Sequence, residues 1–220
     1  RPPRSTLFPY TTLFRSLLDC ASLYYEYAPL NLGEYSLVIM STNKRRELAD
    51  SKYNERRAEC EKALEIINEN KSEKLDNLCQ ATIDDIESFI TDETLKRRAN
   101  HVVTENERVK NSMEMLKNND ILGFGKLLTA SHMSLENDYE VTGLHLDTLV
   151  HEALKIEGCI GARMTGAGFG GCAIALVNNS KIDEFKEKVS AIPCLMIKNI
   201  SIAPLYLSIT VVLLVLILIV

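Results

Sequence analysis

The first part of the chain contains short apolar runs separated by polar residues, a pattern typical of β-strands. Leu17 to Cys20, Leu23 to Ala28 and Tyr35 to Thr42 are apolar or aromatic runs of strand length, and the last of them, YSLVIMST, carries no charge. Uncharged runs of this kind are expected in buried strands. The chain is therefore predicted to open with strands.

From Asp50 onward the apolar residues recur at helical spacing. Asp50 or Ser51 can cap a helix whose apolar stripe consists of Tyr53, Cys60, Leu64 and Ile67. A second helix is predicted at Thr82 to Ile90, and Asp92 offers the cap of a long third helix that ends at Asn118 and Asn119. A further helix is predicted at Leu144 to Ile156. These stripes are most simply core positions.

Two strand-like runs, Cys159 to Met164 and Cys172 to Val177, flank a glycine-rich loop. Ile182, Phe185 and Val189 then mark a last amphipathic helix. Strands and helices are mixed without a regular βαβ alternation. The pattern therefore predicts an α+β fold, with helices packed on a mixed or antiparallel sheet.

Composition and charge exclude some function classes. The chain has 30 acidic and 25 basic residues, a net charge of −5, so it lacks the electrostatic footprint of a nucleic-acid-binding protein. Its six cysteines form no C-x-x-C pair, which favours reduced thiols. None of the four histidines has another histidine four residues away or a cysteine at zinc-finger spacing, so no metal site is predicted.

The N-terminal segment has an unusual origin. Thr6 to Ser16 read TLFPYTTLFRS, which matches, residue for residue, the translation of a widely used sequencing-library adapter. A natural Pro- and Thr-rich leader would have to reproduce this whole run by chance. We therefore expect residues 1–16 to be an assembly artefact, and protein sequence to begin near Leu17.

The C-terminal tail is strongly apolar. No charged residue occurs after Lys198, and Leu205 to Val220 is almost unbroken Leu, Ile and Val. The run is shorter than the roughly 20 residues that a helix needs to cross a bilayer, and Pro204 precedes it. We expect residues 191–220 to be a frameshifted or misassembled tail, with a membrane anchor as the alternative.

The glycine loop is the densest chemical signal of the chain. GARMTGAGFGG, from Gly161 to Gly171, satisfies G-x-G-x-x-G, but the following residues CAIALV predict a strand, where a dinucleotide-binding fingerprint needs a helix. A P-loop is excluded because no Lys followed by Ser or Thr closes the loop. Two interpretations remain: a tight turn that needs glycine for positive φ, and a bare backbone that approaches a phosphate or another chain segment.

Two motifs resemble those of the galactokinase family of GHMP kinases. GARMTGAGFGGC is similar to the third conserved GHMP motif, and TNKRRELADSKYNERRAEC, from Thr42 to Cys60, resembles the segment that follows the catalytic region of galactokinases. The likeness covers Leu17 to about Val189. It implies a GHMP-kinase C-terminal domain at residues 49–190, preceded at 17–48 by remnant strands of an N-terminal kinase domain that is largely missing.

The resemblance also implies roles for individual residues. It points to Tyr53 as a galactose contact and to Arg45 as an arginine that braces the site. The nucleotide phosphates would lie beside a backbone shelf made of Thr165, Gly166, Ala167 and Gly168. Without the family, the simpler interpretation is that Tyr53 is a core tyrosine near a helix start and that Arg45 and Arg46 are an exposed basic pair.

The reaction implied by the resemblance is transfer of the ATP γ-phosphate to the C1 hydroxyl of galactose, with ATP and Mg²⁺ as cofactors, in the cytoplasm. The phosphate loop and catalytic Asp of the family precede Leu17 in family order, so the 220-residue chain itself is expected to be inactive. The alternatives are a non-catalytic sensor of sugar and ATP, and a tail-anchored interaction protein. No membrane partner is predicted, despite the tail at Leu205 to Val220.

Overall fold

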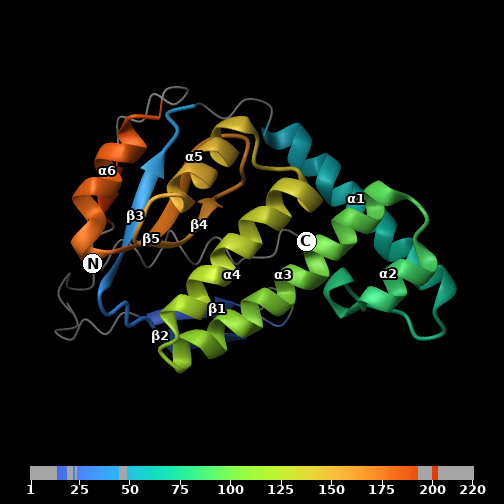
Figure 1. Cartoon of the computed structure of the whole chain (residues 1–220). Coiled ribbons are helices and arrows are strands. Elements are labelled where there is room, and N and C mark those ends of the chain that lie inside the picture. The colour runs from blue at the N-terminus through green and yellow to red at the C-terminus, as the bar shows by residue number, and fades with distance from the viewer. Residues whose placement is uncertain (1–13, 19–21, 23, 45–48, 193–199, 203–220) are drawn as a thin grey trace, which may run out of the picture.

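The centre of the molecule is a four-stranded antiparallel sheet with strand order β4-β5-β3-β6 (Figure 1). The structure is a computed structural model that describes residues 14–18, 22, 24–44, 49–192 and 200–202. The strands of the sheet are β3 (Tyr35–Ser41), β4 (Cys159–Thr165), β5 (Cys172–Asn178) and β6 (Ile200–Ile202). A separate two-stranded ribbon pairs β1 (Phe14–Leu18) with β2 (Tyr25–Pro29).

The sheet joins two distant parts of the chain. β3 pairs with β5 along its whole length, from Tyr35 opposite Asn178 to Ser41 opposite Cys172. The segment 17–48, expected to be a remnant of another domain, thus contributes a central strand beside β5. The domain boundary at residue 48 stays a prediction, as does the foreign origin of residues 1–16, three of which lie in β1.

Six α-helices and one π-helical turn are found in the described part of the chain. The α-helices are α1 (Ala49–Asn70), α2 (Ile83–Phe89), α3 (Glu93–Lys117), α4 (Ile121–Ser134), α5 (Leu144–Leu154) and α6 (Ile182–Ser190). The π-helical turn η2 (Leu135–Tyr139) directly follows α4, and short 3₁₀ turns lie at η1 (Leu78–Gln80) and η3 (Asn179–Lys181).

Side-chain capping explains where α2 and α3 begin. Thr82 forms a reciprocal capping box with Asp85, and the carboxylate of Asp92 accepts hydrogen bonds from the first turn of α3. The predicted cap of α3 at Asp92 is confirmed, and Thr82 is the cap of the helix predicted at Thr82 to Ile90. The predicted cap of α1 is wrong: the helix begins at Ala49, so Asp50 and Ser51 lie inside its first turn.

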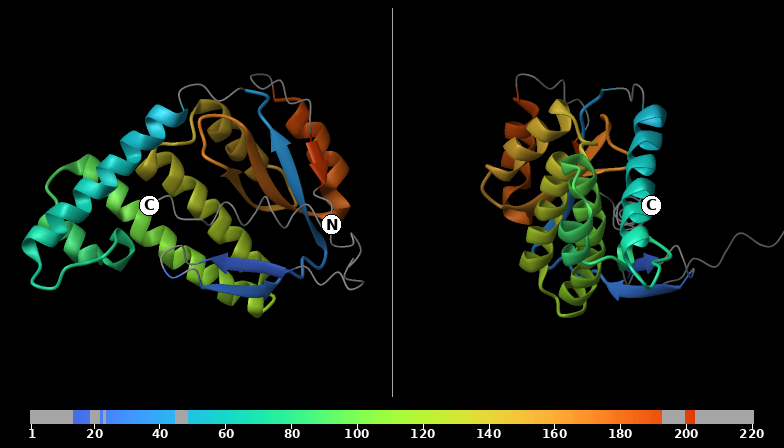
Figure 2. Two further views of the ribbon diagram at one scale, coloured as in Figure 1. Left: turned by 180° about the vertical axis from the view of Figure 1, so that it is seen from behind. Right: turned by 90° about the vertical axis from the view of Figure 1, so that its right-hand side faces the viewer.

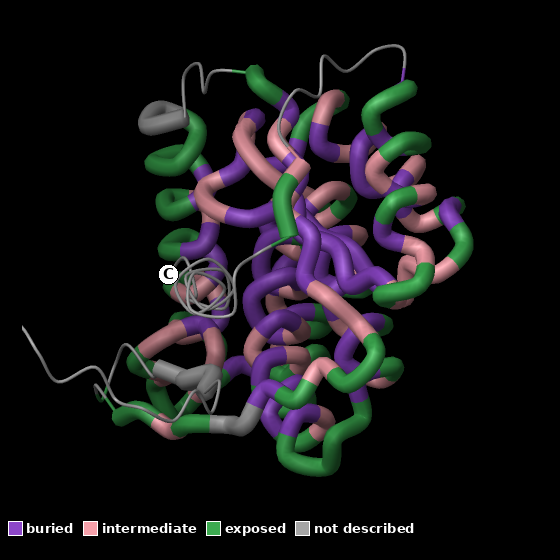
Figure 3. The backbone as a smooth tube through the Cα atoms, turned by 90° about the vertical axis from the view of Figure 1, so that its left-hand side faces the viewer, coloured by how far each residue is buried: buried purple, intermediate pink, exposed green. Residues whose placement is uncertain are grey.

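Both faces of the sheet are covered. Helices α5 and α6 lie against one face (Figures 1 and 2), and the strand residues of that face join α1, α2 and the first half of α3 in the larger core. Ile174 and Leu176 point the other way, into a smaller core with α4 and the end of α3. Figure 3 shows the result, a buried sheet surrounded by helices with exposed outer surfaces.

Helix α4 closes the free edge of β4. The backbone N–H of Ala162 donates to Thr129 Oγ1 at 3.4 Å, and that of Met164 donates to His132 Nδ1 at 3.2 Å. Edge strands with unpaired N–H groups invite pairing with other chains. Two side chains of α4 therefore accept the hydrogen bonds that a neighbouring strand would otherwise accept.

The apolar tail at Leu205 to Val220 lies outside the described residues. Within the part of the chain that is described, no helix has the length and apolar character needed to span a membrane.

Candidate functional site

The glycine loop has an unusual backbone, with most of its residues at positive φ. It consists of Gly166 to Gly171 and connects β4 to β5, and four of its glycines have positive φ, from 82° at Gly166 and Gly168 to 116° at Gly170. Phe169 shares this left-handed region with a φ of 56°, although it carries a side chain. Non-glycine residues adopt this region only where the surroundings hold them there.

The loop is held by two other parts of the chain. The N–H of Phe169 donates to the carbonyl of Val141 at 2.8 Å. On the other side, Thr42 donates to the carbonyl of Gly171 from both its N–H and its hydroxyl, each at 2.9 Å. The loop apex is therefore fixed to the segment before α5, and its far end to the end of β3.

The glycine at position 168 has a structural explanation. A Cβ there would lie 1.9 Å from the carbonyl oxygen of Val141, so only glycine allows this approach. The bare backbone at this point thus meets the protein itself. The predicted phosphate shelf at Thr165, Gly166, Ala167 and Gly168 stays a prediction, with Thr165 buried at the end of β4 and the other three in the loop.

Tyr53 lies on α1 and is 38% exposed, so it is not a core tyrosine and its place in the predicted apolar stripe is wrong. The connection between β4 and β5 lies beside the N-terminal half of α1 in the views of Figures 1 and 2. The element that carries the predicted sugar contact therefore adjoins the predicted phosphate shelf. Arg45 lies outside the described residues.

Two buried arginines near the loop were not predicted. Arg56 on α1 and Arg98 on α3 are 5% and 2% exposed, and both form ion pairs with Glu59 at 2.8 Å. A signal for them exists in the sequence: Arg98 lies three residues after Leu95 on the apolar stripe of α3. A charged residue on a core-facing stripe needs a buried partner.

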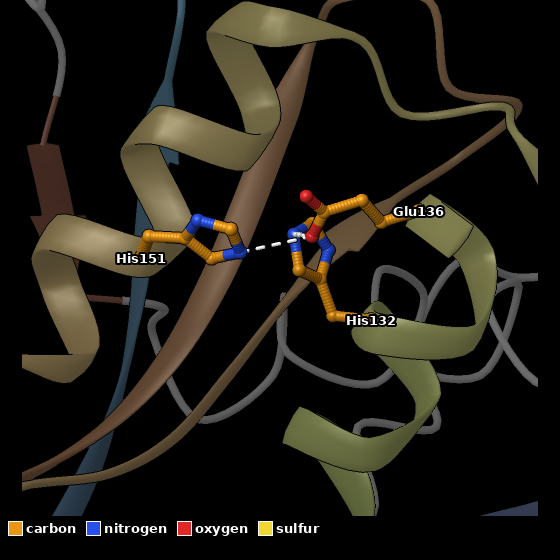
Figure 4. A group of neighbouring side chains, drawn as sticks. All are labelled: His132, Glu136 and His151. Atoms are coloured by element: carbon orange, nitrogen blue, oxygen red, sulfur yellow. Dashed lines mark hydrogen bonds and ion pairs between the residues drawn. The ribbon is translucent and has the colours of Figure 1, made fainter.

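A second cluster, with one side chain from each of α4, η2 and α5, contains metal-ligating groups (Figure 4). His132, Glu136 and His151 bring ligand atoms within 4.8 Å of one another, and this is the one such group of three among the described residues. His151 Nε2 lies 2.8 Å from a carboxylate oxygen of Glu136. Asp147 lies close by, with Oδ1 3.7 Å from His132 Nε2.

The protonation of His132 argues against a metal ion. Its Nδ1 accepts the N–H of Met164, so the proton of the neutral ring is on Nε2. Burial lowers the pKa of His132 to about 3, which keeps the ring neutral. Coordination through Nε2 would move the proton to Nδ1, against the N–H of Met164. The protonated Nε2 of His132 thus lies 3.7 Å from Asp147 and 4.0 Å from Glu136, too far for a hydrogen bond, and both Nε2 and Asp147 Oδ1 are buried without a hydrogen-bond partner among the described residues.

Comparisons with known proteins find related sequences and structures. Residues 112–192 match a family model described as GHMP kinases C terminal. The chain is 59% identical over 177 residues to a galactokinase of Clostridium tetani, covering 79% of this chain and 45% of that protein. A galactokinase of Streptococcus suis is 56% identical over 173 residues, covering 78% and 44%. The chain thus spans less than half the length of these relatives.

Solved structures match as well. The crystal structure of Lactococcus lactis galactokinase complexed with galactose aligns with a TM-score of 0.76 and 46% identity, covering 81% of this chain and 46% of that one. An L. major mevalonate kinase in complex with R-mevalonate aligns with a TM-score of 0.53 at 16% identity, which shows a shared fold.

Proposed function

This chain contains the C-terminal domain of a GHMP kinase of the galactokinase family, and on that premise we propose that the whole protein transfers the γ-phosphate of ATP to the C1 hydroxyl of galactose in the cytoplasm. The predicted family and the predicted α+β fold are confirmed by the family model and the structural match. The activity, the substrates and the roles of single residues belong to the proposal.

The observation that carries the proposal is the 46% identity to a galactokinase whose crystal structure contains galactose. Two features of this chain are consistent with it: the glycine loop adjoins α1, and Tyr53 on α1 is exposed enough to contact a ligand. Phosphoryl transfer depends mainly on positioning and charge neutralisation, which a rigid backbone loop beside a sugar contact would serve.

The described residues fit ATP better than they fit Mg²⁺. A loop of successive glycines suits close approach to phosphate oxygens. The three-ligand cluster found in the described part contains two imidazoles, whereas Mg²⁺ prefers oxygen ligands and its own waters. We therefore propose that Mg²⁺ is bound through the nucleotide and through residues outside the described ones.

A chimera would test the proposal. The part of the Clostridium tetani galactokinase that precedes its match to this chain would be fused to residues 17–190, and galactose-dependent ADP release would be measured. We expect turnover by the chimera and none by the 220-residue chain, because the family's phosphate loop and catalytic Asp come from the added part. Binding of galactose and ATP without turnover would favour a sensor. A chimera that is folded and binds neither would contradict the proposal.

A further inference from the structure

The segment Asp138–Val141, here called the hub segment, is held by two buried arginines from two different helices. Arg56 on α1 donates from Nε to the carbonyl of Tyr139 at 2.7 Å. Arg98 on α3 donates from Nη1 to the carbonyl of Asp138. Two consecutive carbonyls thus each accept from an arginine that is at most 5% exposed.

We propose that Arg56 and Arg98 are positioning residues for the glycine loop: they fix the hub segment, and Val141 at the end of that segment fixes Phe169 at the apex of the loop. The phosphate-binding role of the loop rests on the function proposed above. The mechanical connection from the arginines to the loop rests on the contacts of this chain alone.

Charge balance makes the arrangement rigid. Glu59 pairs with both arginines, and Glu140 pairs with Arg98 at 2.6 Å and with Arg97 at 3.1 Å. Burial opposes the charge of Arg98, but Glu59 and Glu140 outweigh it and raise the pKa of Arg98. Each of the two glutamates pairs with more than one arginine, so these charges form one connected network.

Two residues on the path from the arginines to the loop, Glu140 and Phe169, have a strained backbone. Glu140 adopts a left-handed conformation with a φ of 55° and caps the π-helical turn. Its ion pairs with three arginines, at 2.6 to 3.8 Å, compensate for a conformation that L-residues rarely adopt. The next residue, Val141, then presents its carbonyl to Phe169, which is strained in the same way at a φ of 56°.

The same contacts connect the loop to α1. Arg56 follows Tyr53 by three residues, so the two lie on the same side of the helix. Any shift of α1 relative to the hub segment would move the predicted sugar contact and the glycine loop relative to each other. The arginines would therefore set the spacing between the two substrates.

The test is amide hydrogen exchange in the 220-residue chain carrying Arg56→Lys. Lysine retains the charge opposite Glu59 but cannot also donate the guanidinium Nε–H bond to Tyr139. We expect exchange of the Phe169 amide to accelerate by about tenfold or more, with exchange of the Thr42 amide changed by less than about twofold. Thr42 is the internal reference because its N–H holds the other end of the loop.

Arg57→Lys is the matched control, since Arg57 is the next residue along α1, is exposed and pairs with Glu61 at the surface. It should leave both amides unchanged. Equal acceleration of Phe169 and Thr42 in Arg56→Lys, or acceleration of neither, would overturn the proposal. If that variant does not fold, Glu140→Gln, which alters a half-exposed member of the network, must give the same selective effect on Phe169.

The exchange experiment involves no ligand, so its outcome is independent of the kinase assay. If the Phe169 amide responds selectively but the chimera is inactive, the positioning role of the arginines is supported and the proposed kinase activity is contradicted. If the chimera is active but the Phe169 amide of the 220-residue variant does not respond, only the proposed positioning role is contradicted.

Discussion

Gly143 and Gly168 both have a positive φ, 83° and 82°, but different surroundings. A Cβ at Gly143 would meet nothing within 4 Å, whereas a Cβ at Gly168 would lie 1.9 Å from the carbonyl oxygen of Val141. The pair separates the two reasons for glycine, positive φ and close approach. Single residues can therefore be tested against a matched reference.

We expect Gly143→Ala to lower the free energy of unfolding by about 1–3 kcal/mol, because its φ of 83° and ψ of 157° lie in a region that only glycine adopts readily. Gly168→Ala should lower it by that amount plus roughly 1–3 kcal/mol, because the Val141 carbonyl must move. Urea unfolding followed by circular dichroism measures both. An equal loss of unfolding free energy in the two variants would show that the loop can move away from the Val141 carbonyl at no cost.

Tyr53→Phe tests the predicted sugar contact in the chimera. Loss of one hydrogen bond to the sugar should raise KM for galactose by roughly tenfold, with a smaller effect on KM for ATP. Tyr25→Phe, at a tyrosine that is 58% exposed on β2, is the control and should leave both constants unchanged. An unchanged KM for galactose in Tyr53→Phe would contradict the assignment.

Two buried histidines give the chain an acid-sensitive stability. Burial lowers the pKa of His132 to about 3 and that of His101 to about 4. Both values lie below the ordinary value near 6.5, so the unfolded chain takes up protons first as the pH falls. The stability conferred by the neutral rings is complete above pH 6.5 and is lost as the pH falls toward 3 to 4.

Between pH 6.5 and 5 each of these histidines should lower the free energy of unfolding by about 1.5 kcal/mol. His132→Asn keeps an acceptor for the Met164 N–H and removes one titrating group, so about half of that loss should disappear. Urea unfolding at both pH values provides the comparison. The same pH dependence in variant and parent would indicate that His132 titrates normally.

At the scale of elements, α4 and β4 approach each other through two glycines. A Cβ at Gly125 would lie 2.5 Å from the carbonyl oxygen of Ile160, and one at Gly161 would lie 2.1 Å from that of Gly125. This approach lets Thr129 and His132 reach the strand edge. The close contact between Gly125 and Gly161 is thus needed for α4 to cover the edge of β4.

Gly125→Ala should therefore lower the stability of the protein, although helix propensity alone predicts a gain. At an open helix position this change stabilises by about 1 kcal/mol, but here we expect a loss of roughly 1–3 kcal/mol because the backbones must separate. Lys126→Ala, at the exposed neighbouring position, should change stability by less than about 0.5 kcal/mol. The midpoints of urea unfolding of the two variants measure these changes. A Gly125→Ala variant that is more stable than the parent chain would contradict the close contact between α4 and β4.

The elements differ in how far the sequence could predict them. The continuous apolar stripe and the cap at Asp92 were sufficient for α3, because both signals are local. Leu144 was placed on the apolar stripe of α5 but is 77% exposed, since spacing alone does not show where a stripe begins. The turn η2 carries no local signal, because Arg56 and Arg98, which hold its end, come from distant parts of the chain.

The candidate site could be predicted in part for the same reason. The glycine loop is visible in the sequence because positive φ requires glycine. Its contacts with Val141 and Thr42 are not, since they depend on how the sheet and α5 come together. The sequence also could not separate the two uses of bare backbone, and at Gly168 the structure supports contact with the protein itself.

At the scale of the whole molecule, the chain exposes an aromatic surface on the β1–β2 ribbon. Tyr24, Tyr25 and Tyr27 are 57–58% exposed, and exposed apolar surface favours self-association. We expect size-exclusion chromatography of the 220-residue chain at high concentration to show aggregates. Replacing the three tyrosines by serine should reduce them, whereas a monodisperse parent chain would contradict the expectation.

The π-helical turn has a consequence for insertions and deletions. Its wider winding accommodates one residue more than an α-helical turn would. Deleting one residue between Leu135 and Tyr139 would therefore be absorbed by a return to α-helical winding, whereas the same deletion within α4 would rotate the residues that follow it by about 100°. A deletion within α4 would carry the carboxylate of Glu140 away from Arg98 and the Val141 carbonyl away from Phe169, so the π-helical turn should tolerate the loss of a residue better than the helix before it.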